Sequence, residues 1–259
     1  MSIPHELIIF VAAFVAGAIN SVAGGGTLIT FPVLVWLGRD PVLANATNAF
    51  ALWPGSLAGA YGFRRELGNV RSWLLWFCPA VTLGSILGAW LLLRTSSETF
   101  SQIVPYLILL ATLLVALQEP LMRWLGKSNT SLTAENFITA KPLAAALLSL
   151  FLIGIYGGYF GAGIGILTLG ALGLLGLTDI HQMNGLKNFF ATFINIVAAI
   201  YFAISGAVLW IDALWMGIGA IAGGYFGANL ARKLGRKIVR RIVIAIGLLM
   251  SVSLFVFRG

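Results

Sequence analysis

Long stretches without a charged residue decide how this chain can fold. Six of them have 16 to 24 residues, close to the roughly 20 that a helix needs to cross a bilayer. Two more have 32 and 37 residues. In chain order the eight stretches are Leu7–Gly38, Pro41–Phe63, Ser72–Leu93, Thr99–Gln118, Pro142–Thr178, Asn188–Ile211, Ala213–Ala231 and Ile242–Phe257. We therefore predict an all-α polytopic membrane protein.

The composition excludes a soluble protein. Charged residues make up 9% of the 259 residues and hydrophobic residues 59%, whereas soluble domains carry about 25% charged residues. The net charge of +8 comes from basic residues in short loops, not from one face that could follow phosphates, so we expect no nucleic-acid partner. Cys78 stands alone in an apolar stretch and offers neither a disulfide nor a metal cluster. Residues 1–6 lack Lys and Arg, so we expect no cleaved signal peptide.

Glycine-rich blocks interrupt the two longest stretches near their middles. The first block is Gly24-Gly25-Gly26, and the second runs from Gly157 to Gly163. Each stretch is therefore predicted to form two short helical pieces around a broken centre. The pair is either a re-entrant hairpin or two short crossings, which gives eight to ten membrane segments in total.

The two interrupted stretches and the segments that follow them match each other in order. The matches at an offset of 137 are Gly17 with Gly154, Gly24 with Gly161 and Gly26 with Gly163; those at 139 are Asp40 with Asp179, Asn45 with Asn184, Gly84 with Gly223 and Gly88 with Gly227. We interpret them as an internal duplication. It divides the chain into a first membrane repeat (1–118), a cytoplasmic linker (119–141) and a second membrane repeat (142–259). The glycines of the last two pairs are assigned to close helix packing.

The basic residues indicate how the halves are inserted, because cytoplasmic loops carry an excess of Lys and Arg. If each interrupted stretch leaves on the side where it enters, each half has three further spans and the halves have opposite orientations. Twelve basic residues then lie in the cytoplasm, and Arg39, Arg94 and Arg258 lie outside. This bias favours an inverted-topology repeat, a common build of secondary transporters. The side of the termini depends on the hairpin count, and this count favours both termini outside the bacterial inner membrane.

The two glycine breaks are the strongest candidates for a binding site. A broken helix leaves N–H groups that lipid cannot satisfy, and a helix N-terminus attracts anions. The residues proposed at the breaks are Asn20, Gly24, Gly25, Gly26 and Thr27 in the first half, and Gly161 and Gly163 in the second. Together they predict a site for a small oxyanion. The alternative is that these glycines serve close packing between helices.

A second cluster of polar residues begins the helix after each break. It contains Asn45, Thr47 and Asn48 in one half and Asn184, Lys187 and Asn188 in the other. A charge at membrane depth costs at least about 2.5–3.5 kcal/mol, so Lys187 is interpreted as an anion-binding cation. Snorkelling to the headgroups is the alternative for this lysine. The amides either orient the anion or form hydrogen bonds between helices, and Asn195 is assigned to the latter.

Several kinds of chemistry have no signal in the sequence. No Asp or Glu lies deep within a stretch, which argues against a carboxylate relay for protons. There is no phosphate-binding loop for ATP, no metal-ligand spacing and no catalytic set of nucleophile and base. We therefore expect a protein that is not an enzyme and needs no metal or cofactor. A permease that works by alternating access is the main hypothesis, with a passive anion channel or a non-transporting scaffold as alternatives, and a homodimer stays open.

The paired motifs resemble the sulfite exporter TauE/SafE family of membrane permeases over nearly the whole chain. The first copy runs from Gly17 through the triple glycine to Pro32 and then Ala44-Asn45-Ala46-Thr47-Asn48. The second runs from Gly154 to Gly165 and then Asn184-Gly185-Leu186-Lys187-Asn188, and it has Leu169 where the first copy has proline. The resemblance implies a plasma-membrane carrier for sulfite, thiosulfate or organosulfonates, usually an exporter.

Overall fold

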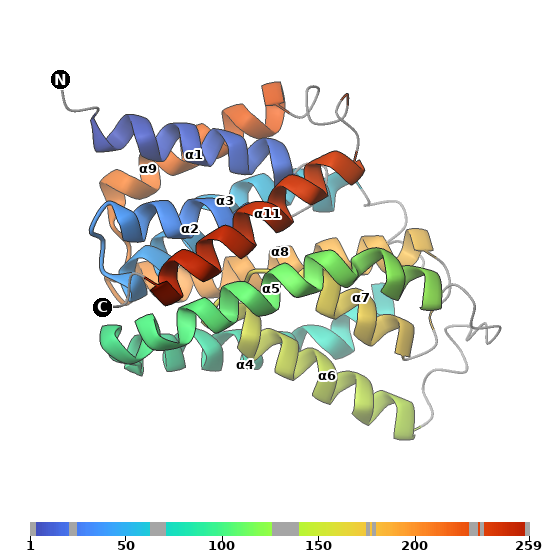
Figure 1. Ribbon diagram of the computed structural model, residues 1–259. Coiled ribbons are helices and arrows are strands. Elements are labelled where there is room, and N and C mark those ends of the chain that lie inside the picture. The colour runs from blue at the N-terminus through green and yellow to red at the C-terminus, as the bar shows by residue number, and fades with distance from the viewer. Residues whose placement is uncertain are drawn as a thin grey trace.

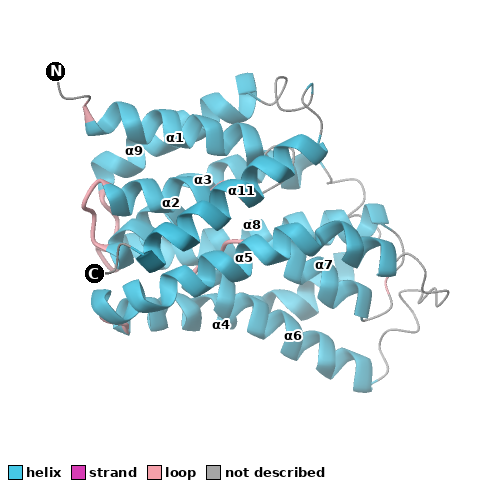
Figure 2. Ribbon diagram, viewed as in Figure 1, coloured by secondary structure: helices cyan, strands magenta, loops and turns pink. Residues whose placement is uncertain are grey.

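The computed structural model is an all-helical bundle. It describes residues 4–20, 25–62, 71–125, 140–174, 177, 180–227, 233 and 236–256. The helices are α1 (His5–Asn20), α2 (Thr27–Trp36), α3 (Pro41–Gly62), α4 (Arg71–Arg94), α5 (Ser97–Leu125), α6 (Ala140–Tyr159), α7 (Ile164–Leu174), α8 (Ile180–Ile204), α9 (Trp210–Ala222), η3 (Gly223–Gly227) and α11 (Arg236–Val256). Figure 2 shows helices and a few short loops, with no strand in the described ranges. The prediction of an all-helical protein is confirmed.

Both long apolar stretches are split into two short helices at their glycines, as predicted. Gly25 lies between α1 and α2 with φ +95°, and Gly161 and Gly163 lie between α6 and α7 with φ +83° and +81°. These backbone angles favour glycine because a Cβ atom would be strained there. Glycines therefore stand where one helix ends and the chain turns into the next.

The helices form two groups that meet along the middle of the bundle. In the upper group, α9 packs on α1 and α3, and α2 packs on α3 (Figure 1). In the lower group, α4 packs on α6 and α8, and α7 packs on α8. The groups meet where α3 contacts α8 and where α5 contacts α11. Each pairing in one group has a counterpart in the other. The upper group includes α9 and α11 from the second half of the chain, and the lower group includes α4 and α5 from the first half.

Glycines allow the closest helix contacts in both groups. A Cβ on Gly84 would lie 2.2 Å from the carbonyl oxygen of Phe151, and one on Gly223 would lie 1.8 Å from that of Phe14. Phe14 and Phe151 are 137 residues apart, the offset already found between the glycine breaks. The predicted packing role is thus confirmed for Gly84 and Gly223, and also for Gly88, where a Cβ would lie 2.0 Å from a backbone oxygen. Gly227 ends η3, and its contacts lie outside the described ones.

Some helix ends differ from the charge-free stretches. The expected break at Asp212 is wrong, because the chain turns at residues 205–209 and Asp212 lies in the first turn of α9. An acidic side chain suits the positive N-terminal end of a helix, so a charge there does not end it. Charge alone also does not delimit α8, which begins at Ile180 and includes Lys187. The helix α11 begins at Arg236, six residues before the last stretch.

The outer surface of the bundle is apolar. In the described ranges, four helices are long and apolar enough to cross a membrane, within Phe77–Arg94, Ser97–Leu117, Gly185–Ile204 and Ile238–Phe255. Large hydrophobic side chains point outward, among them Leu83, Ile211 and Leu249, which are 62–69% exposed. Such a surface suits lipid and not water. In Figure 1, α1 begins and α11 ends at the same end of the bundle.

Candidate functional site

The break between α6 and α7 is held by one tyrosine. The backbone carbonyl of Tyr156 accepts the N–H groups of Phe160 at 2.9 Å and Gly161 at 3.2 Å. Its hydroxyl donates to the carbonyl of Ala162 at 2.7 Å. Within the described chain, no backbone carbonyl accepts the N–H groups of Ala162 and Gly163, which precede the first turn of α7. This break therefore presents amide donors at a helix N-terminus.

Lys187 lies against the same helix turn. Its aliphatic carbons Cγ and Cδ are 3.4 Å from the position that a Cβ of Gly165 would occupy, and Gly165 is the second residue of α7. The absence of a side chain at Gly165 leaves room for the lysine to pass over the start of α7. Lys187 and the following Asn188 are both half-buried. The structure thus brings the predicted lysine to the predicted second break.

At the first break, between α1 and α2, other residues of the protein bond to the glycines or fill the space beside them. The side-chain oxygen of Asn20, at the end of α1, accepts the N–H of Gly26 at 2.7 Å. A Cβ on Gly26 would lie 2.9 Å from the carbonyl oxygen of Ala16, and one on Gly25 would lie 2.9 Å from a methyl carbon of Val243. Gly24 lies outside the described residues. The two breaks therefore match in position, but at the first one a side-chain oxygen already accepts the N–H of Gly26.

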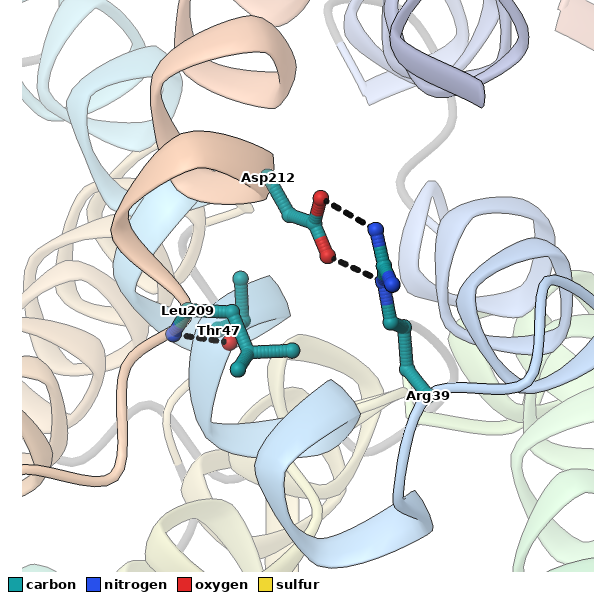
Figure 3. Close-up of polar contacts among 4 residues, drawn as sticks. All are labelled: Arg39, Thr47, Leu209 and Asp212. Atoms are coloured by element: carbon teal, nitrogen blue, oxygen red, sulfur yellow. Dashed lines mark hydrogen bonds and ion pairs between the residues drawn. The ribbon is translucent and has the colours of Figure 1, made fainter. Parts of the chain in front are cut away.

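The polar cluster that begins α3 links helices. The side-chain oxygen of Asn48 accepts the hydroxyl of Thr30, and its NH₂ group donates to the hydroxyl oxygen of Thr27 at 3.4 Å. The hydroxyl oxygen of Thr47 accepts the backbone N–H of Leu209 at 3.0 Å (Figure 3). Asn48 and Thr47 are buried. Both polar groups of the Asn48 amide are therefore used between α3 and α2.

Asn45 links the two helix groups. It is 1% exposed, and its NH₂ group donates to the carbonyl of Tyr159, the last residue of α6, at 2.9 Å. Its side-chain oxygen is buried and has no hydrogen-bond partner among the residues that the structure describes. The counterpart Asn184 lies in α8, but its side chain is outside the described part of the structure.

Sequence reasoning missed an ion pair at the end of the bundle where α11 ends. The guanidinium of Arg39 donates to both carboxylate oxygens of Asp212, at 2.7 and 3.1 Å (Figure 3). Asp212 is 3% exposed, whereas the side chain of Arg39 is 35% exposed. The pair ties the loop between α2 and α3 to the start of α9. The one signal in the sequence is that the predicted topology places both residues on the outer side.

Comparisons with known proteins find relatives along nearly the whole chain. The profile of the family described as sulfite exporter TauE/SafE matches residues 9–254. A probable membrane transporter protein of Haemophilus influenzae is 32% identical, covering 95% of this chain and 93% of its own length. The probable membrane transporter protein YfcA of Escherichia coli is 29% identical, covering 95% and 88%.

A more distant relative extends the comparison beyond these two species. The probable membrane transporter protein YunE of Bacillus subtilis is 26% identical, covering 88% of this chain and 89% of its own length. No solved structure matches the chain. The family profile covers nearly the whole sequence, and the relatives are similar over most of their length. The chain therefore belongs to the sulfite exporter TauE/SafE family of membrane transporters.

Proposed function

We propose that this protein carries a small sulfur-containing anion, such as sulfite, thiosulfate or an organosulfonate, and binds it at the break between α6 and α7. The observation that carries the proposal is the position of Lys187 along the first turn of α7. A helix N-terminus is equivalent to about half a positive charge. An ammonium group on the same turn adds a full charge, so the two attract an anion together.

The donors around the break support an oxyanion. The N–H groups of Ala162 and Gly163 have no backbone acceptor within the described chain, and oxyanions bind well to such groups. We place Gly161, Gly163, Asn184, Lys187 and Asn188 around the anion. In this proposal the other predicted residues form the counterpart in the first half, which binds the anion less directly because Asn20 and Asn48 already pair with neighbouring helices. These residues are Asn20, Gly24, Gly25, Gly26, Thr27, Asn45, Thr47 and Asn48.

The arrangement of the helices supports an inverted-topology repeat. We propose that α1–α2 and α6–α7 are re-entrant hairpins that enter from opposite sides of a bacterial inner membrane, with both termini outside. The matched pairings α1–α9 and α6–α4 support this proposal. So does the ion pair of Arg39 with Asp212, two residues that this topology places on the same side.

The division of the bundle into two helix groups supports alternating access. We propose that the groups rock against each other where α3 faces α8 and α5 faces α11, which exposes the anion to one side at a time. Export is the direction that we propose, because the matching family is described as a sulfite exporter.

The test is transport by the purified protein in proteoliposomes. Uptake and counterflow of sulfite, thiosulfate, taurine and sulfate would be compared for the native protein, Lys187→Ala and Lys233→Ala. Lys233 is exposed, so its variant controls for the loss of one positive charge. We expect saturable counterflow that Lys187→Ala abolishes and Lys233→Ala retains. Undiminished transport by Lys187→Ala would remove the lysine from the site, and a large electrical conductance would favour a channel.

A further inference from the structure

Several oxygen atoms at the C-terminal end of α6 have no hydrogen-bond donor among the described residues. Asn45 is 1% exposed, and its NH₂ group donates to the carbonyl of Tyr159 at 2.9 Å. This bond sets the orientation of the amide, because the opposite orientation would bring two oxygens together. The side-chain oxygen of Asn45 is left buried, with no partner in the described part of the chain. Since the oxygen and nitrogen of an amide are about 2.3 Å apart, this oxygen lies beside the C-terminal end of α6.

Two backbone carbonyls in the last turn of α6 also lack a backbone donor within the described chain. The carbonyls of Gly157 and Gly158, in the last turn of α6, accept no backbone N–H from the described residues. The carbonyl oxygen of Gly157 is 3.1 Å from the position of a Cβ on Gly161, and the side-chain oxygen of Asn195 is 3.7 Å from that position. The C-terminal end of a helix is also equivalent to about half a negative charge. The oxygens and the helix end together favour a positive ligand.

We propose that the end of α6 binds a monovalent alkali cation, for which the side-chain oxygens of Asn45 and Asn195 and the last carbonyls of α6 are the ligands. Broken helices of membrane transporters offer such carbonyls to sodium ions. An unpaired buried acceptor is costly, and a bound cation removes that cost. The oxygens are neutral, and no cluster of three or more His, Cys, Asp or Glu is found among the described residues. A divalent ion, which prefers carboxylates, is therefore disfavoured.

The cation site is distinct from the anion site but adjacent to it in the chain. Tyr159 ends α6, and Ile164 begins α7 only five residues later. A cation at the end of one helix and an anion at the start of the next partly neutralise each other. The cation is thus a candidate coupling ion for transport. This role rests on the proposed function, whereas the existence of the cation site does not.

Thermal unfolding of the purified protein tests the site. The midpoint would be measured in NaCl, KCl and choline chloride at constant ionic strength, with no candidate anion substrate added. We expect Na⁺ or K⁺ to raise the midpoint over choline by about 4 °C or more at saturation. Asn45→Leu, in α3, should abolish this rise. Ser149→Ala, at a half-buried position of α6 whose hydroxyl donates to the carbonyl of Ala145, should retain it. Equal midpoints in the three salts would overturn the proposal and leave a water molecule as the ligand of Asn45.

A second variant keeps the test decisive if Asn45→Leu does not fold. Asn195→Leu removes the other side-chain oxygen and should reduce the rise caused by Na⁺ or K⁺; an unchanged rise would contradict the proposal. Transport assays separate the two proposals. A cation-dependent midpoint without anion transport would support the cation site and refute the carrier function. Anion transport with no cation-dependent midpoint would support the carrier function and refute the cation site.

Discussion

The contact between α4 and α6 gives a prediction that can be worked from distances. A Cβ at position 88 would lie 2.0 Å from the carbonyl oxygen of Ile155 and 2.8 Å from the backbone nitrogen of Tyr159. An ordinary contact begins at 3.4 Å. In Gly88→Ala the methyl group and this oxygen must therefore move about 1.4 Å apart, and a gap of 0.5–1 Å already loses a quarter to a half of the dispersion energy of each contact.

The obstacle is backbone, so it cannot turn away as a side chain would. Overpacking a well-packed core costs about 1–3 kcal/mol, and we expect Gly88→Ala to lose about 3 kcal/mol of unfolding free energy. Because α6 leads into the second break, anion transport should fall as well. Unfolding in detergent by a chemical denaturant measures the first effect, and proteoliposome flux measures the second.

The matched control is Gly217→Ala in α9. The nearest atom to a Cβ at Gly217 is a backbone oxygen at 3.9 Å, so the methyl group fits. Alanine favours helix over glycine by about 0.5–1 kcal/mol, and this variant should be as stable as the native protein or more stable. If Gly88→Ala proved as stable as Gly217→Ala, the close approach of α4 and α6 would be refuted.

Three further predictions concern single polar contacts. Arg39→Gln should lower the unfolding free energy by about 3 kcal/mol, because the buried carboxylate of Asp212 loses its partner. Adding Asp212→Asn should recover part of the loss. If the double variant lost the sum of the two single losses in denaturant unfolding, this prediction would be contradicted. Thr30→Val should lower the unfolding free energy by about 1–3 kcal/mol because the side-chain oxygen of Asn48 loses a donor. In the same assay, the double variant Thr30→Val with Asn48→Leu should lose less than the sum of the two single variants. Tyr156→Phe removes the hydroxyl that bridges the second break, so anion binding measured by calorimetry should weaken about fivefold; an unchanged affinity would separate this hydroxyl from the site.

The helical breaks could be predicted from the sequence because backbone chemistry decides them. Gly25, Gly161 and Gly163 adopt positive φ angles that favour glycine, and each lies in a glycine-rich block that is visible without a structure. The packing role of Gly84 and Gly223 could be predicted for a similar reason. Small residues let helix backbones approach, and their recurrence at one offset marked them as equivalent.

The partners of polar side chains could not be predicted. Arg39 and Asp212 are 173 residues apart, and only the packing of α9 against the first half of the chain brings them together. The same limit applies to Asn45, because nothing near it in the sequence indicates that it bonds to Tyr159 at the end of α6. The limits of the charge-free stretches also gave the wrong start for α9, because Asp212, which is buried and paired with Arg39, can lie within a helix.

The most direct test of the proposed site is the affinity of the protein for sulfite and thiosulfate with and without the lysine. The dissociation constants would be measured by calorimetry on the native protein, Lys187→Gln and the exposed control Lys233→Gln. Two unit charges 4 Å apart interact by about 4 kcal/mol at an effective dielectric constant of 20, and the half-buried position of Lys187 reduces this. We predict that Lys187→Gln weakens binding about a hundredfold, whereas Lys233→Gln leaves it unchanged. Equal dissociation constants for the three proteins would contradict an anion site at the start of α7.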